Sequence, residues 1–174
     1  MAPLPTRETF ASLLNHTLLD PTFSNAQVIA GLELARQNHV ALATVRPCDA
    51  DLAVRTLEGA ATRAAVIAGY PFGFQNTGVK LYEARDLLRR GIREIGVVMA
   101  VAQLASREFQ HIQTELNQMT EACRAESARL TVYLDTPALT TELKIIACTC
   151  IERAEVDAVA VPDASDLEIG RAHV

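Results

Sequence analysis

The sequence predicts an α/β fold built on a parallel β-sheet, because three features occur together. Short apolar runs, many of them β-branched, alternate with longer amphipathic segments of helical periodicity. The runs start roughly 24 to 36 residues apart, which is the size of a βα unit. They are apolar almost throughout, as in parallel strands covered by helices. No linker or low-complexity segment divides the chain, so we expect one domain of six βα units.

The predicted strands are six apolar runs. They are residues 13–19 (LLNHTLL), 40–45 (VALATV), 64–69 (AAVIAG), 94–101 (EIGVVMAV), 130–135 (LTVYLD) and 157–161 (DAVAV). Two architectures fit this order: a doubly wound open sheet and an incomplete (β/α)8 barrel. The phosphate-binding patterns G-x-G-x-x-G and G-x-x-x-x-G-K-[ST] are absent, which removes the usual nucleotide-binding reason for an open sheet.

Helical periodicity is clearest in three of the intervening segments. The first begins at Ser24, a favourable N-cap residue, and its apolar positions share one face: Val28, Leu32 and Ala35. In the second, VKLYEARDLLRRG, Gly91 is expected to end the helix, and three residues are expected to point inward: Val79, Tyr82 and Leu87. The third runs from Ser106 to about Ser127. It is the longest and most polar, so we expect it on the outside.

Composition argues against several classes of partner. The 174 residues carry a formal net charge of −5, contain no tryptophan and are 5% aromatic. Nucleic-acid binding requires basic surface and stacking side chains, so no nucleic-acid partner is expected. No apolar run approaches the ~20 residues of a membrane span, and residues 1–14 lack a basic region followed by an apolar core. We therefore expect a cytoplasmic protein without a membrane partner.

The cysteines are expected to be buried or reduced thiols. They are Cys48, Cys123, Cys148 and Cys150. Cys148 and Cys150 stand two residues apart in a predicted helix and point to different sides, so they cannot easily share a metal ion.

Three stretches carry a family resemblance. Residues 15–24 (NHTLLDPTFS) resemble D-H-T-L-L-x-P-x-x-T, and residues 66–84 (VIAGYPFGFQNTGVKLYEA) resemble V-I-G-F-P-L-G-x-x-x-T-x-x-K-x-x-E-A. Residues 130–140 (LTVYLDTPALT) are similar to K-V-I-I-E-T-x-x-L-T. These patterns belong to the deoxyribose-phosphate aldolases, and the resemblance runs colinearly from about residue 13 to 161. It implies a (β/α)8 barrel.

The resemblance also implies a reaction. The family cleaves 2-deoxyribose 5-phosphate into glyceraldehyde 3-phosphate and acetaldehyde through a lysine Schiff base, without a cofactor. A lysine must be neutral to attack a carbonyl, so such a residue sits where its environment favours the free amine. An aspartate and a further lysine transfer the protons.

At the positions of this chemistry the chain departs from the family pattern. The Schiff-base lysine of the sixth strand is matched by Ala160, and the fourth-strand aspartate by Gly96. Three more positions also differ: Thr131 matches the fifth-strand lysine, Asn15 the first-strand aspartate and Thr44 the second-strand cysteine. No catalytic residue of the family pattern is therefore intact, and an alanine cannot form an imine.

Part of the pocket wall is retained in the sequence. Thr17 matches a threonine near the family's substrate, although a strand threonine bonded to its neighbour explains it equally well. Asp135 and Thr136 match the fifth-strand E-T pair. The predicted substrate-binding residues are Asn15, Thr17, Thr44, Asp135 and Thr136. Gly69, Pro71 and Gly73 keep the tight third loop, where glycine permits close backbone approach.

Another lysine or a metal ion could replace the missing chemistry. The two lysines of the chain, Lys80 and Lys144, both fall in predicted helices, where long cationic side chains usually face water. His16, Asp135 and Asp163 could face one barrel mouth and hold a divalent metal. However, Asp163 follows Pro162 in a turn that favours aspartate for itself, so the expectation is no metal and no cofactor.

Three functions therefore stay open from the sequence. The first is a family member that has lost Schiff-base chemistry and binds a small phosphosugar without turnover. The second is an active lyase with a relocated lysine or a metal. The third is a scaffold or regulatory subunit that associates with an intact aldolase through the helices of the barrel. The possible assemblies are a homo-oligomer or a complex with that partner aldolase, and a homo-oligomer alone would count against the third function.

The C-terminal residues 169–174 also have a non-biological explanation. In EIGRAHV, the residues from Ile169 to Val174 match the translation of a widely used sequencing-library adapter. We expect them to be a non-native tail and the aldolase-like part to be residues 1–168.

Overall fold

The computed structural model describes residues 6–134 and 139–161, and its centre is one parallel sheet. The six strands follow each other in sequence order across the sheet. They are β1 (Asn15–Leu18), β2 (Leu42–Val45), β3 (Arg63–Ala68), β4 (Glu94–Val98), β5 (Arg129–Tyr133) and β6 (Ala158–Ala160). All six predicted strands are confirmed, with bounds shifted by a few residues.

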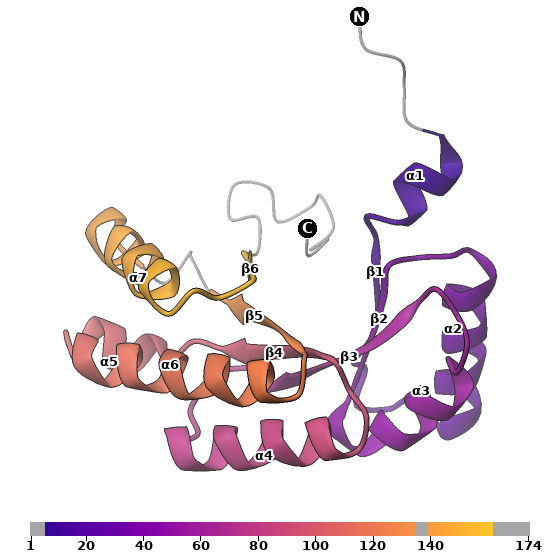
Figure 1. Cartoon of the computed structure of the whole chain (residues 1–174), viewed down its shortest axis with the longest axis horizontal. Helices are drawn as coiled ribbons and strands as arrows, with labels where there is room; N and C mark the ends of the chain where they lie inside the picture. The colour runs from indigo at the N-terminus through magenta and orange to yellow at the C-terminus, as the bar shows by residue number, and fades with distance from the viewer. Residues whose placement is uncertain (1–5, 135–138, 162–174) are drawn as a thin grey trace, which may run out of the picture.

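The helices that follow β1 lie on the outer side of a curled sheet, which forms a half-barrel, whereas the short helix before β1 lies beyond the start of that strand (Figure 1). They are α1 (Arg7–Ala11), α2 (Asn25–Gln37), α3 (Ala50–Thr56), α4 (Thr77–Arg89), α5 (Val101–Ala105), α6 (Phe109–Ala125) and α7 (Thr141–Arg153); a short 3-10 helix, η1 (Pro47–Asp49), precedes α3. A doubly wound sheet reverses its strand order at one point and has helices on both faces. The sequential order and the single helical layer instead confirm the barrel architecture.

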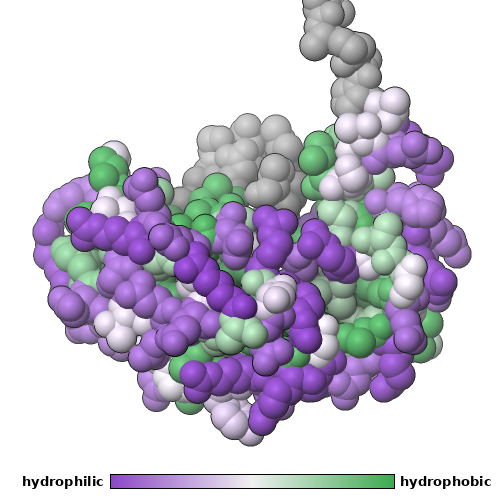
Figure 2. All heavy atoms as spheres, in the orientation of Figure 1, coloured by the Kyte–Doolittle hydropathy of each residue, from purple (hydrophilic) through white to green (hydrophobic). Residues whose placement is uncertain are grey.

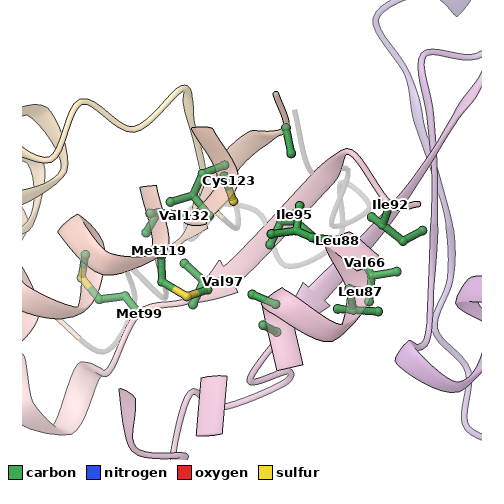
Figure 3. Packing of buried hydrophobic residues seen from close by; sticks show 14 of the residues in the cluster. Val66, Leu87, Leu88, Ile92, Ile95, Val97, Met99, Met119, Cys123 and Val132 are labelled. Atoms are coloured by element: carbon green, nitrogen blue, oxygen red, sulfur yellow. The ribbon is translucent and has the colours of Figure 1, made fainter. Parts of the chain in front are cut away.

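The main core lies between the outer face of the sheet and the helices. Leu87 and Leu88 of α4 are buried with Val66 of β3 and with Ile95 and Val97 of β4 (Figure 3). Further along the same layer, Met119 and Cys123 of α6 pack near Val132 of β5. Hydrophilic residues dominate the face shown in Figure 2, with apolar residues between them.

Most of the predicted helical features are confirmed. Ser24 is the N-cap of α2 and forms a capping box with Gln27. The predicted inward residues Val28, Leu32 and Ala35 are buried. Gly91 follows the C-cap of α4 with a positive φ of 98°, a conformation that favours glycine. At 17 residues, α6 is the longest helix in the described part of the chain.

The predicted inward face of α4 is wrong at two of three positions. Leu87 is buried, but Val79 and Tyr82 are 51% and 70% exposed. The buried stripe instead runs through Lys80, Ala84, Leu87 and Leu88, which share one side of the helix at i, i+4, i+7 and i+8. A lysine in the buried stripe interrupts its apolar pattern, so hydrophobic periodicity alone favours the neighbouring face of the helix.

No helix within residues 6–134 and 139–161 has both the length and the apolar character needed to cross a membrane.

Replacing Ser24 with alanine should lower the free energy of unfolding by about 1 kcal/mol, since the N-cap oxygen accepts a bond from the Gln27 backbone N–H. Urea titration followed by circular dichroism measures the change. Ser106→Ala, at the exposed C-cap of α5, is the control and should leave stability within about 0.5 kcal/mol of the unaltered chain. Equal effects of the two substitutions would refute the capping role.

Candidate active site

Strand register decides which side chains point into the half-barrel. Thr17 pairs with Thr44, Gly96 with Thr131, and Tyr133 with Ala160. Side chains alternate along a strand, and partners in adjacent strands share a face. The inner face therefore brings together residues of all six strands, among them Asn15, Thr17, Thr44, Ile67, Gly96, Thr131, Tyr133 and Ala160.

The Tyr133 ring packs closely over Gly96 on this inner face. A Cβ atom built at Gly96 would meet Tyr133 Cε2 at 2.7 Å and Cδ2 at 3.2 Å, and Ile67 Cγ1 at 3.1 Å. Because real Cβ atoms essentially never come within 3.0 Å of another heavy atom, any larger residue at position 96 requires the tyrosine ring to move. The ring fills the space that a side chain on β4 would take.

Hydrogen bonds join three strands across the interior. The Thr44 hydroxyl donates to Asn15 Oδ1 at 2.8 Å, which links β2 to β1. Burial raises the pKa of the Tyr133 phenol above its ordinary value of 10.0, while a side-chain hydrogen bond with Thr44 acts in the opposite direction. Tyr133 thus interacts with the Thr44 side chain from β5, and the phenol stays protonated at neutral pH.

Three of the five predicted substrate-binding residues lie together on the inner face. Asn15 and Thr44 are hydrogen-bonded to each other, and Thr17 is exposed on the same side of β1. Asp135 and Thr136 lie outside the described residues. Ala160 is buried, with 6% of its surface exposed, and ends β6 beside Tyr133. Tyr133 itself was missed, because its neighbours in the sequence do not reveal the empty space at Gly96.

Of the three side chains considered as ligands of a metal ion, only His16 belongs to the described residues. His16 alternates with Asn15 and Thr17, so it faces the helices, where it lines a hollow with Phe10 and Leu34. Asp163 lies outside the described residues, as do Asp135 and residues 169–174. Among residues 6–134 and 139–161, no group of three or more histidine, cysteine or acidic side chains could hold a metal ion.

Lys80 is buried and paired, so its predicted exposure to solvent is wrong. The side chain is 0% exposed, and Nζ lies 2.8 Å from Glu115 Oε1 on α6. Nζ also donates to the Val98 carbonyl at 2.9 Å, and Thr77 donates to Glu115 Oε2 at 2.9 Å. Burial of a charge is tolerated where an opposite charge and hydrogen bonds satisfy it. Lys144, in contrast, is half-buried on α7.

Glycines and one carboxylate hold the loop after β3 against the sheet. Gly69 donates its N–H to Glu83 Oε2 at 3.0 Å, and a Cβ there would meet Lys80 Cε at 3.1 Å. Gly73 has a φ of 67°, and a Cβ there would meet the Met99 carbonyl oxygen at 2.7 Å. The prediction of close backbone approach at these glycines is confirmed. Thr77, Lys80 and Glu83 of the T-x-x-K-x-x-E pattern therefore all make contacts that fix this loop.

The cysteines are free thiols in the described structure. Cys123 and Cys150 are buried, whereas Cys48 and Cys148 are exposed. The predicted divergence of Cys148 and Cys150 within one helix is confirmed. Burial raises the pKa of the Cys123 thiol to about 12, and the nearby Asp157 acts in the same direction. Cys123 is therefore an unreactive core thiol.

Sequence comparison finds relatives over most of the chain. A deoxyribose-phosphate aldolase of Treponema denticola is 34% identical over 146 residues, covering 83% of this chain and 67% of its own. One of Bacteroides thetaiotaomicron is 31% identical over 153 residues, covering 87% and 64%. This chain thus spans about two-thirds of the length of these curated relatives. No family model matches it.

Structure comparison agrees on the fold. A Coccidioides immitis protein provisionally named deoxyribose-phosphate aldolase superposes with a TM-score of 0.86 at 26% identity, over 91% of this chain and 62% of its own. A tetrameric deoxyribose phosphate aldolase of Aeropyrum pernix superposes with a TM-score of 0.82 at 23% identity, over 90% and 65%.

Removing one partner of the buried ion pair should destabilise the chain strongly. We expect Lys80→Met to lower the free energy of unfolding by about 3–5 kcal/mol, because Glu115 is left buried and unpaired. The double change Lys80→Met with Glu115→Leu should recover much of this loss. Urea titration gives both values, with Lys144→Met as the matched control. A Lys80→Met effect no larger than that of Lys144→Met would contradict the assignment.

The Tyr133 phenol should ionise above its ordinary pKa of 10.0, because burial disfavours the phenolate. Since the unfolded chain releases this proton first, the free energy of unfolding should fall as pH rises from about 10 through the folded-state value. Phenolate absorbance during a pH titration measures the ionisation. Tyr133→Phe should remove the absorbance step at the highest pH, whereas Tyr82→Phe should retain that step. Persistence of that step in Tyr133→Phe would refute the assignment.

Proposed function

Because this chain belongs to the deoxyribose-phosphate aldolase family, we propose that it keeps the family's barrel scaffold but does not perform aldol cleavage through a Schiff base. The observation that carries the proposal is the residue at the inward end of β6. Ala160 stands there, next to Tyr133 on β5, at the position where the family pattern has its lysine.

The chemistry of imine formation supports the proposal. An amine nitrogen attacks the aldehyde carbon, a C–N bond forms, and the carbonyl oxygen leaves as water. The methyl group of Ala160 has no lone pair for this attack. Gly96, at the position of the family's aspartate, has no side chain to move a proton. Imine formation therefore lacks its amine, and proton transfer lacks its carboxylate.

Neither native lysine supports the alternative of a relocated nucleophile. Nζ of Lys80 is fully buried and donates to Glu115 and to the Val98 carbonyl, so an aldehyde has no approach to it. Glu115 belongs to α6, on the outer side of the sheet, whereas the inner face carries Thr44, Gly96 and Ala160. Lys144 belongs to α7 of the outer helical layer.

The partners that we propose follow from the same family. A small phosphosugar is the ligand class the scaffold would accept, and a homo-oligomer is the assembly, by analogy with the tetramer of Aeropyrum pernix. A regulatory association with an intact aldolase is the alternative role. A cytoplasmic location is also part of the proposal.

Reductive trapping tests the absence of Schiff-base chemistry. The chain is incubated with acetaldehyde and sodium borohydride, which transfers hydride to any imine and fixes it as a secondary amine. We expect no more ethyl adduct than free amines form without enzyme, and no cleavage of 2-deoxyribose 5-phosphate. Peptide mass spectrometry assigns any adduct to Lys80, Lys144 or the N-terminus.

An intact family aldolase is the positive control, and Lys144→Arg identifies background labelling of the half-buried lysine. Rapid, saturable adduct formation at Lys80 or Lys144, together with cleavage of the phosphosugar, would overturn the proposal in favour of a relocated nucleophile. Substrate cleavage without any adduct would overturn it in favour of chemistry that needs no imine.

A further inference from the structure

We infer that Tyr133 acts as a plug, that is, a side chain that blocks access to the site. Its ring occupies the interior of the half-barrel and shields position 160. The site would then lack both the Schiff-base lysine and the space for a ligand. The inference deepens the proposed function, on which it rests, by naming the residue that excludes a ligand. Nothing in the family pattern quoted above requires an aromatic side chain at this position.

Three observations place the ring over the inner face of the sheet. Tyr133 and Ala160 are register partners on neighbouring strands, so a side chain at 160 lies directly beside the ring. The ring also covers Gly96 on β4, where it would stand 2.7 Å from an added Cβ. Ile67 of β3 closes the far side of the same space, 3.1 Å from that Cβ. The ring therefore occupies the centre of the inner face.

The phenol hydroxyl engages polar groups that face the pocket. Tyr133 shares a side-chain hydrogen bond with Thr44, and Thr44 donates to Asn15 at 2.8 Å. Two of the residues predicted to contact substrate are thus already bonded within the protein. A sugar hydroxyl would have to displace these bonds, and a buried donor or acceptor left without its partner costs roughly 1–3 kcal/mol.

The space that remains beside the ring is small. A cavity of about 160 Å³ lies between the first two strands and the last two. It is lined by Leu13, Leu14, Asn15, Ala41 and Leu42 at the start of β1 and β2, and by Thr131, Tyr133, Ala158, Val159 and Ala160 of β5 and β6. Pockets for small-molecule ligands usually enclose about 300–1,000 Å³. With the ring in place, the volume of this cavity is therefore below the usual range for a small-molecule pocket.

Thiol alkylation at position 160 tests the plug directly. We compare Ala160→Cys alone with Ala160→Cys carrying Tyr133→Leu, using iodoacetamide, which forms a C–S bond with the thiolate and releases iodide. The tryptic peptide of residues 154–171 contains no native cysteine, so its mass reports this position alone. We expect shortening Tyr133 to increase the alkylation rate at 160 at least tenfold.

Two further backgrounds separate the ring from other effects. Tyr133→Phe keeps the ring and should leave the rate low, and Tyr82→Leu, an exposed tyrosine on α4, should leave it unchanged. Each variant must retain the circular dichroism of the unaltered chain, and Tyr133→Ile replaces Tyr133→Leu if the latter does not fold. Equal rates with and without Tyr133, whether both fast or both slow, would overturn the plug.

Imine trapping then connects access with chemistry. Ala160→Lys with intact Tyr133 should give little ethyl adduct at 160 with acetaldehyde and borohydride, and the added Tyr133→Leu should increase it. An equally strong adduct in the single variant would overturn the inference. Because these readouts concern position 160, they are independent of labelling at Lys80 or Lys144, on which the proposed function is judged.

Discussion

The alternation of side chains along parallel strands governs this molecule. Each strand sends every second residue into the half-barrel and the others towards the helices, and the register between strands fixes which inward residues meet. Thr44 lies opposite Thr17, and Ala160 opposite Tyr133, for this reason alone. The same alternation turns His16 towards α1 and α2, although its neighbours Asn15 and Thr17 face the interior.

On the outer side of the sheet, a buried ion pair fixes the positions of neighbouring elements. Lys80 on α4 and Glu115 on α6 neutralise each other behind the sheet, and Lys80 also binds the last carbonyl of β4. The pair therefore joins two helices and a strand at one point. Glu83 and the two glycines of the preceding loop extend this connection to the end of β3. The most specific sequence match in the chain thus has a structural role that does not depend on catalysis.

The strands and the helix caps could be predicted from the sequence, because local chemistry decides them. Ser24 caps α2 through Gln27, three residues away, and apolar runs identify all six strands. Lys80 and Tyr133 could not be placed in this way. Lys80 is buried only because Glu115, 35 positions later, neutralises it. Tyr133 turns over Gly96 only because a glycine on the neighbouring strand leaves room. Both depend on contacts between distant segments, which periodicity does not report.

The fit of Tyr133 over Gly96 has a consequence for how such a protein can change over time. The Tyr133 ring and an aspartate at position 96 cannot occupy the same space above β4. A change from glycine to aspartate at position 96 therefore also requires a smaller side chain at position 133, and that smaller side chain has to come first. Under the proposed function, a lysine introduced at position 160 while Tyr133 is kept would not restore the reaction. The packing of Tyr133 over Gly96 then means that no single substitution returns the site to the family pattern.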